Sequence, residues 1–316
     1  MTQKSFLATC LLSCLAVFVI VHPLLFATAW GVPNERERYL AEWVEIKKHY
    51  AGTVNRPKLN IITASSALFG IDAARMERTL NIPVVNMGTH GTLGRQEFKI
   101  YRDNIKAGDI VLLPLEPVFY KDGSFGNEYT AYILGYKPEY FQELDLWKKI
   151  RFVYSMYSWD LLGFARERFL PKDKHETGYS SQHLDKNGDM TYYQNQRPLN
   201  NLSHDLRSDV YEHDVNISDE AKAELHEFVA WCNNNNIKVY ATWSPMMYKD
   251  RSLTDGDKAA VATIRSFWEG ENVPVLGEQA ETLYPIEFFY DGFAHMNELG
   301  KEHYTDWLIA QLKPYM

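Results

Sequence analysis

The stretch NIITASSALFG, residues 60–70, poses the central structural question of this 316-residue chain. It begins as a continuous apolar run, which is typical of a strand that is buried on both faces. It then stops at two adjacent serines, Ser65 and Ser66. A serine at the end of a buried strand either caps the helix that follows or serves as a nucleophile. The rest of the sequence bears on that choice.

On both sides of this stretch, apolar runs alternate with helical patterns. The runs lack strict alternation of polar and apolar residues, which favours parallel strands covered by helices. We therefore predict a three-layer α/β/α sandwich with a five-stranded parallel sheet of flavodoxin-like type. The expected strands are residues 58–64, 82–88, 109–117, 237–245 and 272–277. The expected helices between and after them include residues 70–80, 94–108, 218–236 with Ser218 as N-cap, 256–270 and 297–315.

Two segments stand apart from this pattern. Residues 118–215 form an aromatic-rich insertion after the third strand, with helical stretches in residues 144–169 and a hairpin turn predicted at Asn187-Gly188. Residues 35–52 carry apolar residues at helical spacing and predict a helix that leads into the domain. We expect one domain from residue 32 to residue 316, with the insertion inside it.

The N-terminal segment, residues 1–31, is predicted to meet a membrane. It contains Lys4 and then an uncharged, mostly apolar run from Phe6 to Trp30, and about 20 such residues span a bilayer. An uncleaved transmembrane signal anchor and a signal peptide cleaved after Ala27-Thr28-Ala29 both fit the pattern. In either case the domain is exported, for example to the periplasm, and the few flanking charges lean towards an N-terminus in the cytoplasm.

Composition narrows the function classes. The formal net charge is -8, and no dense Lys/Arg face is present, so nucleic acid is not an expected partner. Two of the three cysteines, Cys10 and Cys14, lie in the apolar run, and Cys232 alone follows it, so no disulfide is expected within the exported part. No metal-ligand spacing and no nucleotide-binding glycine pattern is found, and no cofactor is predicted.

Three chemistry-bearing segments follow predicted strands or precede the last helix. They are Ala64-Ser65-Ser66, the segment NMGTHG with Asn86, Gly88 and His90, and the segment YDGFAHMNELG with Asp291 and His295. Carboxyl ends of parallel strands gather at one edge of a sheet, where ligands bind. Serine, histidine and aspartate together supply a nucleophile, a base and a group that orients the base. Each has a plainer alternative, since serines cap helices and a loop histidine is often only a surface residue.

On these residues the chain resembles the SGNH (GDSL-like) hydrolase superfamily, in the membrane-anchored branch associated with acylation or deacylation of cell-surface polysaccharides. The resemblance covers roughly residues 57–120 and 218–314. It implies Ser66 as the nucleophile, Asp291 and His295 as its partners, and an oxyanion hole made by the Ser66 and Gly88 N–H groups with Asn86.

The chain also departs from that superfamily. Ala64 stands where the first motif has glycine, and Asp291 and His295 are four positions apart where three is common, so the loop between them must bulge. Glu116 stands near the usual place of an asparagine that donates to the oxyanion. We expect Glu116 either to contact substrate or to have a structural partner.

Substrate contacts are predicted less directly. His90 is a candidate for lining the pocket, and aromatic residues are candidates for stacking on sugar rings, although aromatic residues at helical spacing commonly form core. The candidates are Tyr120, Tyr129, Tyr132 and Trp243.

The sequence thus predicts a serine-dependent esterase or O-acyltransferase that acts on acyl, in particular acetyl, groups of an exported or cell-surface polysaccharide. The expected partners are the acylated glycan and a membrane acyl-transfer or polysaccharide-export protein. The alternative is a catalytically inactive relative, which binds glycan or serves as a scaffold in a polysaccharide assembly machine. A nucleotide-binding flavodoxin-like protein is a weaker third reading.

Overall fold

The computed structural model describes residues 3–123, 125–170, 180–191, 216–248 and 253–316. The chain divides into two compact units. We call residues 42–123 and 178–316 the α/β unit, and residues 1–41 and 124–177 the helical unit. In this division residues 124–177, the larger part of the aromatic-rich insertion, group with the N-terminal helix, and the single domain expected from residue 32 onward stays a prediction.

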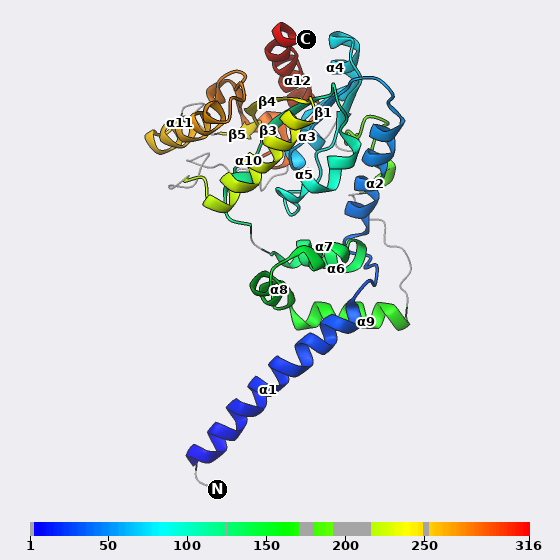
Figure 1. Ribbon diagram of the computed structural model, residues 1–316, viewed down its shortest axis with the longest axis vertical. Coiled ribbons are helices and arrows are strands. Elements are labelled where there is room, and N and C mark those ends of the chain that lie inside the picture. The colour runs from blue at the N-terminus through cyan, green and yellow to red at the C-terminus, as the bar shows by residue number, and fades with distance from the viewer. Residues whose placement is uncertain (1–2, 124, 171–179, 192–215, 249–252) are drawn as a thin grey trace. The chain divides into compact units, whose positions relative to one another are not determined.

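The α/β unit is built on a four-stranded parallel sheet with strand order β2-β1-β3-β4 (Figure 1). The strands are β1 (Leu59–Ile61), β2 (Val84–Asn86), β3 (Ile110–Leu115) and β4 (Lys238–Trp243). All four lie within runs that the sequence predicted as strands. Nearly every residue in them is buried, as expected for a parallel sheet covered by helices.

The predicted fifth strand is not formed as such. Residues 272–277 lie alongside β4 but make a single parallel bridge, between Ala241 and Val275. The neighbouring residue Pro274 accepts a hydrogen bond from Ala241 N–H but has no N–H of its own to donate. The proline explains why the ladder does not extend into a full strand.

Helices connect and cover these strands. In the α/β unit they are α3 (Ser65–Gly70), α4 (Ala73–Leu80), α5 (Gln96–Tyr101), α10 (Asp219–Asn234), α11 (Asp255–Gly270) and α12 (Glu298–Leu312). Helix α2 (Arg38–Thr53) precedes β1. Ser218 accepts a hydrogen bond from Ala221 N–H, so its predicted role as N-cap of α10 is confirmed.

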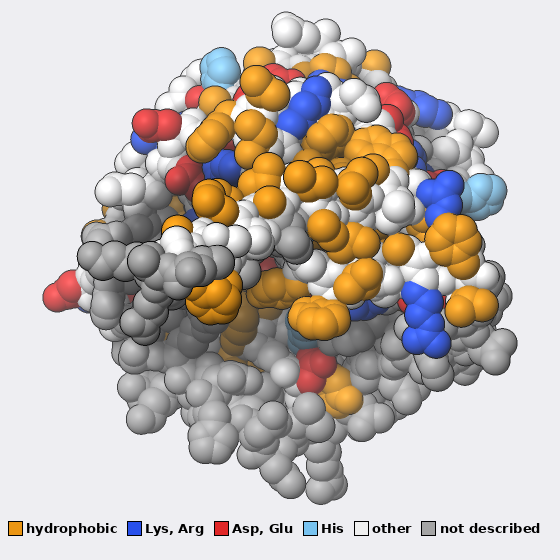
Figure 2. Space-filling view, turned by 90° about the horizontal axis from the view of Figure 1, so that it is seen from below, with side chains coloured by type: hydrophobic (Ala, Val, Ile, Leu, Met, Phe, Trp, Pro, Cys, Tyr) orange, Lys and Arg blue, Asp and Glu red, His pale blue; other side chains and the backbone are white. Residues whose placement is uncertain are grey.

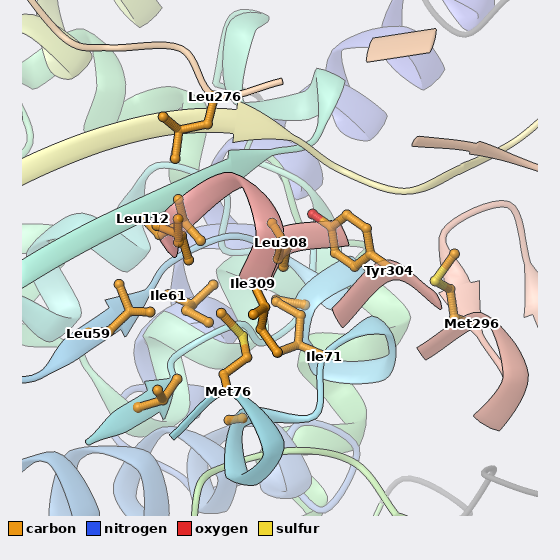
Figure 3. Packing of buried hydrophobic residues seen from close by; sticks show 14 of the residues in the cluster. Leu59, Ile61, Ile71, Met76, Leu112, Leu276, Met296, Tyr304, Leu308 and Ile309 are labelled. Atoms are coloured by element: carbon orange, nitrogen blue, oxygen red, sulfur yellow. The ribbon is translucent and has the colours of Figure 1, made fainter. Parts of the chain in front are cut away.

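One face of the sheet packs against α4 and α12 to form the main hydrophobic core (Figure 3). Leu59 and Ile61 of β1 point to the same side, as alternate residues of a strand must, and meet Met76 of α4 and Leu308 of α12. This core fixes β1 against the last helix. The chain therefore brings residues that follow β1 near residues that precede α12.

The predicted turn at Asn187-Gly188 is present in a reduced form. Gly188 has φ of +96°, which glycine adopts without strain, and a single antiparallel bridge joins Leu184 to Met190. Tyr192 and Tyr193 of the predicted hairpin lie outside the described residues. The segment that follows Gly178 returns to the α/β unit, where it contacts α3.

The helical unit contains α1 (Gln3–Ala29), α6 (Asn127–Tyr136), α7 (Glu139–Glu143), α8 (Leu146–Val153) and α9 (Ser158–Phe169). Residues Ala8–Ala29 of α1 are long and apolar enough to span a membrane. Phe26, near the end of α1, packs against Phe141 of α7 and Phe152 of α8. The helices of the insertion thus complete their core with the N-terminal helix.

Candidate active site

A serine, a histidine and an aspartate are joined by hydrogen bonds at the carboxyl end of β1. His295 Nδ1 lies 2.7 Å from Asp291 Oδ1, and His295 Nε2 lies 2.8 Å from Ser65 Oγ. The side chains of His295 and Asp291 are 20% and 19% exposed. The arrangement can move a proton from the hydroxyl to the imidazole and is open enough to meet a substrate.

The serine in this contact is Ser65, and the prediction of Ser66 is wrong on this point. Ser66 Oγ is buried and has no hydrogen-bond partner within the described ranges. Consecutive residues of a helix project about 100° apart. Since Ser65 and Ser66 open α3, only one of them can face His295, and the sequence alone did not reveal which.

His295 and Asp291 are presented by a short antiparallel hairpin, β7 (Phe289–Gly292) and β8 (His295–Met296). The pairing is irregular between Phe289 and Gly292, in agreement with the bulge expected from the four-residue spacing. Gly292 stands opposite His295, and a Cβ at this position would be in ordinary van der Waals contact with the imidazole, 3.5 Å from Nδ1.

The start of α12 holds this hairpin in place. Asn297 caps α12 by accepting a hydrogen bond from Gly300 N–H, and its Nδ2 donates to Glu287 O at 2.7 Å. A Cβ on Gly300 would lie 2.2 Å from Phe288 O, so only glycine lets helix and hairpin approach this closely. The NELG sequence after His295 therefore acts as a rigid support for the base.

The ring of Phe69, on α3, supports the imidazole from the other side. The two ring centroids are 4.3 Å apart and nearly parallel. Phe69 itself is buried. The same short helix thus positions both Ser65 and one face of His295.

Glu116 lies directly after β3, beside the start of α3. Its Oε1 accepts a hydrogen bond of 2.7 Å from Ser66 N–H, and the residue is buried. Of the two roles left open by the sequence, the contact in the structure is with a backbone N–H group. This N–H was expected in the oxyanion hole, and in this structure it is already occupied by a carboxylate.

The other expected oxyanion donors are also engaged. Gly88 N–H donates to Asn86 Oδ1 at 3.0 Å, and Asn86 Nδ2 donates to Ala67 O and Asp189 Oδ1, both at 2.7 Å. Asn86 therefore ties β2 to α3 and presents no free donor. A Cβ on Gly88 would lie 2.7 Å from Ala64 O, so this glycine serves close packing under the serine loop.

A buried ionic network below the site was not predicted. Lys47 Nζ donates to Asn86 O at 2.8 Å and to Gly188 O, while Asp189 Oδ2 accepts from Ala73 N–H at 2.6 Å. Burial is the largest cause of two shifts in pKa, which lower the pKa of Lys47 to about 8 and raise that of Asp189 to about 7. A sequence signal for Lys47 existed, since it lies one helical turn after the buried Trp43 on the apolar face of α2.

The same network attaches residues 185–190, the part of the insertion that belongs to the α/β unit, to α3. Met190 N–H donates to Leu68 O at 2.9 Å, and Lys301 of α12 donates from Nζ to Met190 O at 2.7 Å. Residues 185–190 thus hold the serine-bearing helix against the last helix. Far-separated parts of the chain cooperate to fix the distance from Ser65 to His295.

A further buried acid, Glu97, lies at the start of α5 and contacts the turn after β2. Glu97 of α5 is hydrogen-bonded to Thr89 Oγ1, and burial raises the pKa of its carboxyl well above the ordinary value. His90, in the same turn, accepts a hydrogen bond at Nδ1 from Thr92 N–H at 3.3 Å. The contact ties His90 to its own turn.

The aromatic residues expected to stack on sugar are core residues. Trp243 and Tyr120 are each 2% exposed, with Trp243 Nε1 donating to Gly277 O and Tyr120 OH accepting from Trp268 Nε1. Tyr129 and Tyr132 of the helical unit are buried as well. The rings of all four residues are buried, so the prediction of a sugar platform at these positions is wrong.

Within the described ranges, no cluster of three or more His, Cys, Asp or Glu side chains is arranged to hold a metal ion. Comparison with known proteins adds no assignment. No protein-family model matches the chain, and no curated protein matches its sequence.

Proposed function

We propose that the chain is a serine-dependent esterase or O-acyltransferase of the SGNH type, with Ser65 as its nucleophile. The observation that carries the proposal is the hydrogen-bonded series Ser65–His295–Asp291. His295 Nε2 takes the hydroxyl proton as Oγ attacks an ester carbonyl, and it returns the proton to the leaving alcohol. Asp291 fixes the tautomer of His295 and stabilises the imidazolium ion.

The fold supports this assignment. The order β2-β1-β3-β4 is that of the first four strands of flavodoxin-like sheets, where ligands bind between the first and third strands at their carboxyl ends. Ser65 follows β1 and Glu116 follows β3, on the two sides of that point. With Ser65 as nucleophile, the first motif of the superfamily falls on Thr63-Ala64-Ser65, one position earlier than the sequence alone suggested.

The oxyanion of the tetrahedral intermediate is where this chain differs most from an ordinary member. The Ser65 N–H belongs to the first turn of α3, where N–H groups have no partner inside the helix. The Ser66 and Gly88 N–H groups are held by Glu116 and Asn86. Each missing donor costs about a hundredfold or more in rate, so we expect slow turnover with simple esters.

Those occupied donors favour one second candidate, a catalytically inactive protein that binds glycan or organises a polysaccharide assembly. In this alternative Ser65, His295 and Asp291 form a polar surface site for a sugar hydroxyl. The two candidates differ in one property, because only the enzyme forms a covalent acyl-serine.

Hydrolysis of a chromogenic acetyl ester by the full chain in detergent distinguishes the enzyme from the inactive protein. The enzyme requires that Ser65→Ala reduces the rate to the uncatalysed level, while the matched neighbour Ser66→Ala retains the wild-type rate. Equal rates for wild type and Ser65→Ala would leave the binding or scaffolding role.

We further propose that α1 anchors the protein in a membrane with the remainder outside the cytoplasm, where it acts on acyl groups of an exported or surface glycan. The apolar stretch Ala8–Ala29 supports the anchor. Water as acceptor makes the protein an esterase, and a sugar hydroxyl makes it a transferase, in which case a membrane acyl-transfer or export protein supplies the acyl group. Protease accessibility of the C-terminal part in intact cells, compared with lysed cells, tests the orientation.

A further inference from the structure

The helical unit exposes large apolar side chains to an unusual degree. Trp159 of α9 is 83% exposed and Trp147 of α8 is 69% exposed. Further large apolar side chains are exposed in α8, in α9 and in the residues that adjoin α9: Leu146, Ile150, Tyr157, Leu162, Phe169 and Leu170. In the part of Figure 2 that is not grey, many hydrophobic side chains are visible on the face seen from below, with Lys and Arg side chains among and beside them. Large apolar side chains exposed in two neighbouring helical segments mark a contact with a partner or a membrane.

The position of α9 along α1 favours a membrane over a protein partner. At its first residue, Ser158 Oγ lies 2.9 Å from His22 Nδ1, and near its end Arg168 Nη1 donates to Thr28 O at 3.0 Å. His22 precedes the end of the apolar span at Ala29 by seven residues, which corresponds to about 10 Å of helix. If α1 crosses a bilayer, the start of α9 lies inside the apolar layer and its end lies near the headgroups.

The contact between α9 and α1 includes a buried histidine, His22, whose polar atoms are satisfied without water. His22 is only 3% exposed, and both of its ring nitrogens have partners, since Nε2 lies 2.8 Å from Val153 O. The ring also stacks on Tyr154 at 5.0 Å. A polar residue within a membrane span is stable when it faces protein and is fully hydrogen-bonded, as His22 is.

The charges near the apolar face match an anionic lipid surface. Helix α8 carries three cations within its eight residues, and α9 carries two in its last turn: Lys148, Lys149, Arg151, Arg166 and Arg168. Trp and Tyr beside Lys and Arg are the composition of helices that lie in the membrane interface. A groove between α1 and α9, lined by Phe18, Val21, Leu25 and Leu162, continues the apolar surface from one helix to the other.

We propose that α8 and α9 lie within the lipid–water interface, partly immersed among anionic lipids, and form a second membrane anchor beside α1. The apolar side chains of α8 and α9 enter the acyl region, and the basic side chains meet the headgroups. The inference rests on the membrane-spanning role proposed for α1 and does not depend on the chemistry of Ser65.

Collision of spin labels with oxygen and with a water-soluble nickel chelate tests the proposal. The full chain is prepared with C10S, C14S and C232A and placed in vesicles of phosphatidylcholine and phosphatidylglycerol. A label on Trp159→Cys should collide several-fold more with oxygen than with nickel, at a depth of about 5–10 Å. A label with greater nickel than oxygen collision would mean that α9 lies in water, and it would overturn the proposal.

Two control labels separate this result from failure of the main anchor. Leu15→Cys lies in the middle of α1 and is exposed, and Leu299→Cys lies on α12 of the α/β unit. Leu15 should report lipid and Leu299 should report water. Lipid at Leu15 with water at Trp159 would overturn the second anchor alone, whereas water at both would overturn α1 as an anchor as well.

A measurement without labels covers the case in which a label disturbs packing. Phosphatidylcholine brominated in its acyl chains quenches tryptophan fluorescence by contact. The quenchable fraction should fall in Trp159→Phe and in Trp147→Phe, and it should not fall in the matched variant Trp268→Phe, whose ring is buried in the α/β unit. Equal quenching in wild type and in the two α8 and α9 variants would contradict the proposal.

Discussion

The two units of the chain differ in how far their large apolar side chains are exposed. The α/β unit hides its apolar residues in a core and gives its buried charges specific partners, such as Lys58 Nζ at 2.5 Å from Asp109 Oδ2. The helical unit leaves Trp147 and Trp159 exposed on its surface. This difference is the one expected if the helical unit contacts lipid, as we propose, because an exposed indole is unfavourable in water and favourable at a lipid interface.

The comparison also assigns the proposed functions to different parts of the chain. The chemistry rests on residues of the α/β unit, and the attachment rests on residues of the helical unit. Substitutions in the α/β unit should therefore change turnover or stability and leave the attachment to the membrane unchanged.

Removing the base should have the largest effect. In His295→Ala the hydroxyl of Ser65 has no proton acceptor, so we expect ester turnover to fall by about 10⁴-fold or more. The matched control is His226→Ala, an exposed histidine of α10 that is hydrogen-bonded to Glu271. Initial rates with a soluble acetyl ester provide the measurement. Comparable losses in both variants would show that the effect arises from something other than the site.

Breaking the buried ion pair should have the next largest effect, on stability. Lys58→Met leaves Asp109 buried without its cation, and such a change costs about 3–5 kcal/mol. Asp109 would retain only its uncharged donors, among them Asn60 Nδ2. Urea unfolding followed by circular dichroism measures the change in free energy of unfolding. Lys258→Met, in an exposed pair with Asp255, should match wild type, and an equal cost in both would contradict the role of burial.

A smaller effect should appear as a dependence of stability on pH. Burial raises the pKa of Asp189 from 3.8 to about 7, so the folded protein holds this proton more tightly than the unfolded chain does. The stability from this group is complete below its unfolded-state pKa and is lost as pH rises through about 7. The slope is at most about 1.4 kcal/mol per pH unit. Urea midpoints between pH 4 and pH 7 should decline less steeply in Asp189→Asn, and an unchanged slope would refute the assignment.

The smallest effect is expected at Ser66. Its hydroxyl is buried without a partner in the described part of the chain, so Ser66→Ala should change the free energy of unfolding by no more than about 0.5 kcal/mol. The same urea titration provides the value. A loss of several kcal/mol would mean that the hydroxyl has a stabilising partner.

The sequence predicted the sheet well where apolar runs were uninterrupted. It failed at residues 272–277, because the pattern of apolar residues does not register the missing N–H of Pro274. It also located the loop of Asp291 and His295, since a helix N-cap at Asn297 is a local signal. Whether Ser65 or Ser66 faces that loop depends on the rotation of α3, which is set by Asn86, Met190 and the core.

Side-chain environment was the least predictable property. Tyr120 and Trp243 carry polar tips that suit either a binding surface or a core, and only the positions of Trp268 and Gly277 decide between these. Glu116 likewise could be assigned only when Ser66 N–H was placed beside it. Such pairings join residues up to about 150 positions apart, beyond the reach of local pattern.

We infer that Ser65, and not its neighbour, shares a proton with His295. Treatment of the full chain with a fluorophosphonate, followed by tandem mass spectrometry of the peptide that contains both serines, tests it most directly. The account predicts a covalent adduct on Ser65 that is absent from His295→Ala. An adduct on Ser66, or no adduct on a folded protein, would contradict it.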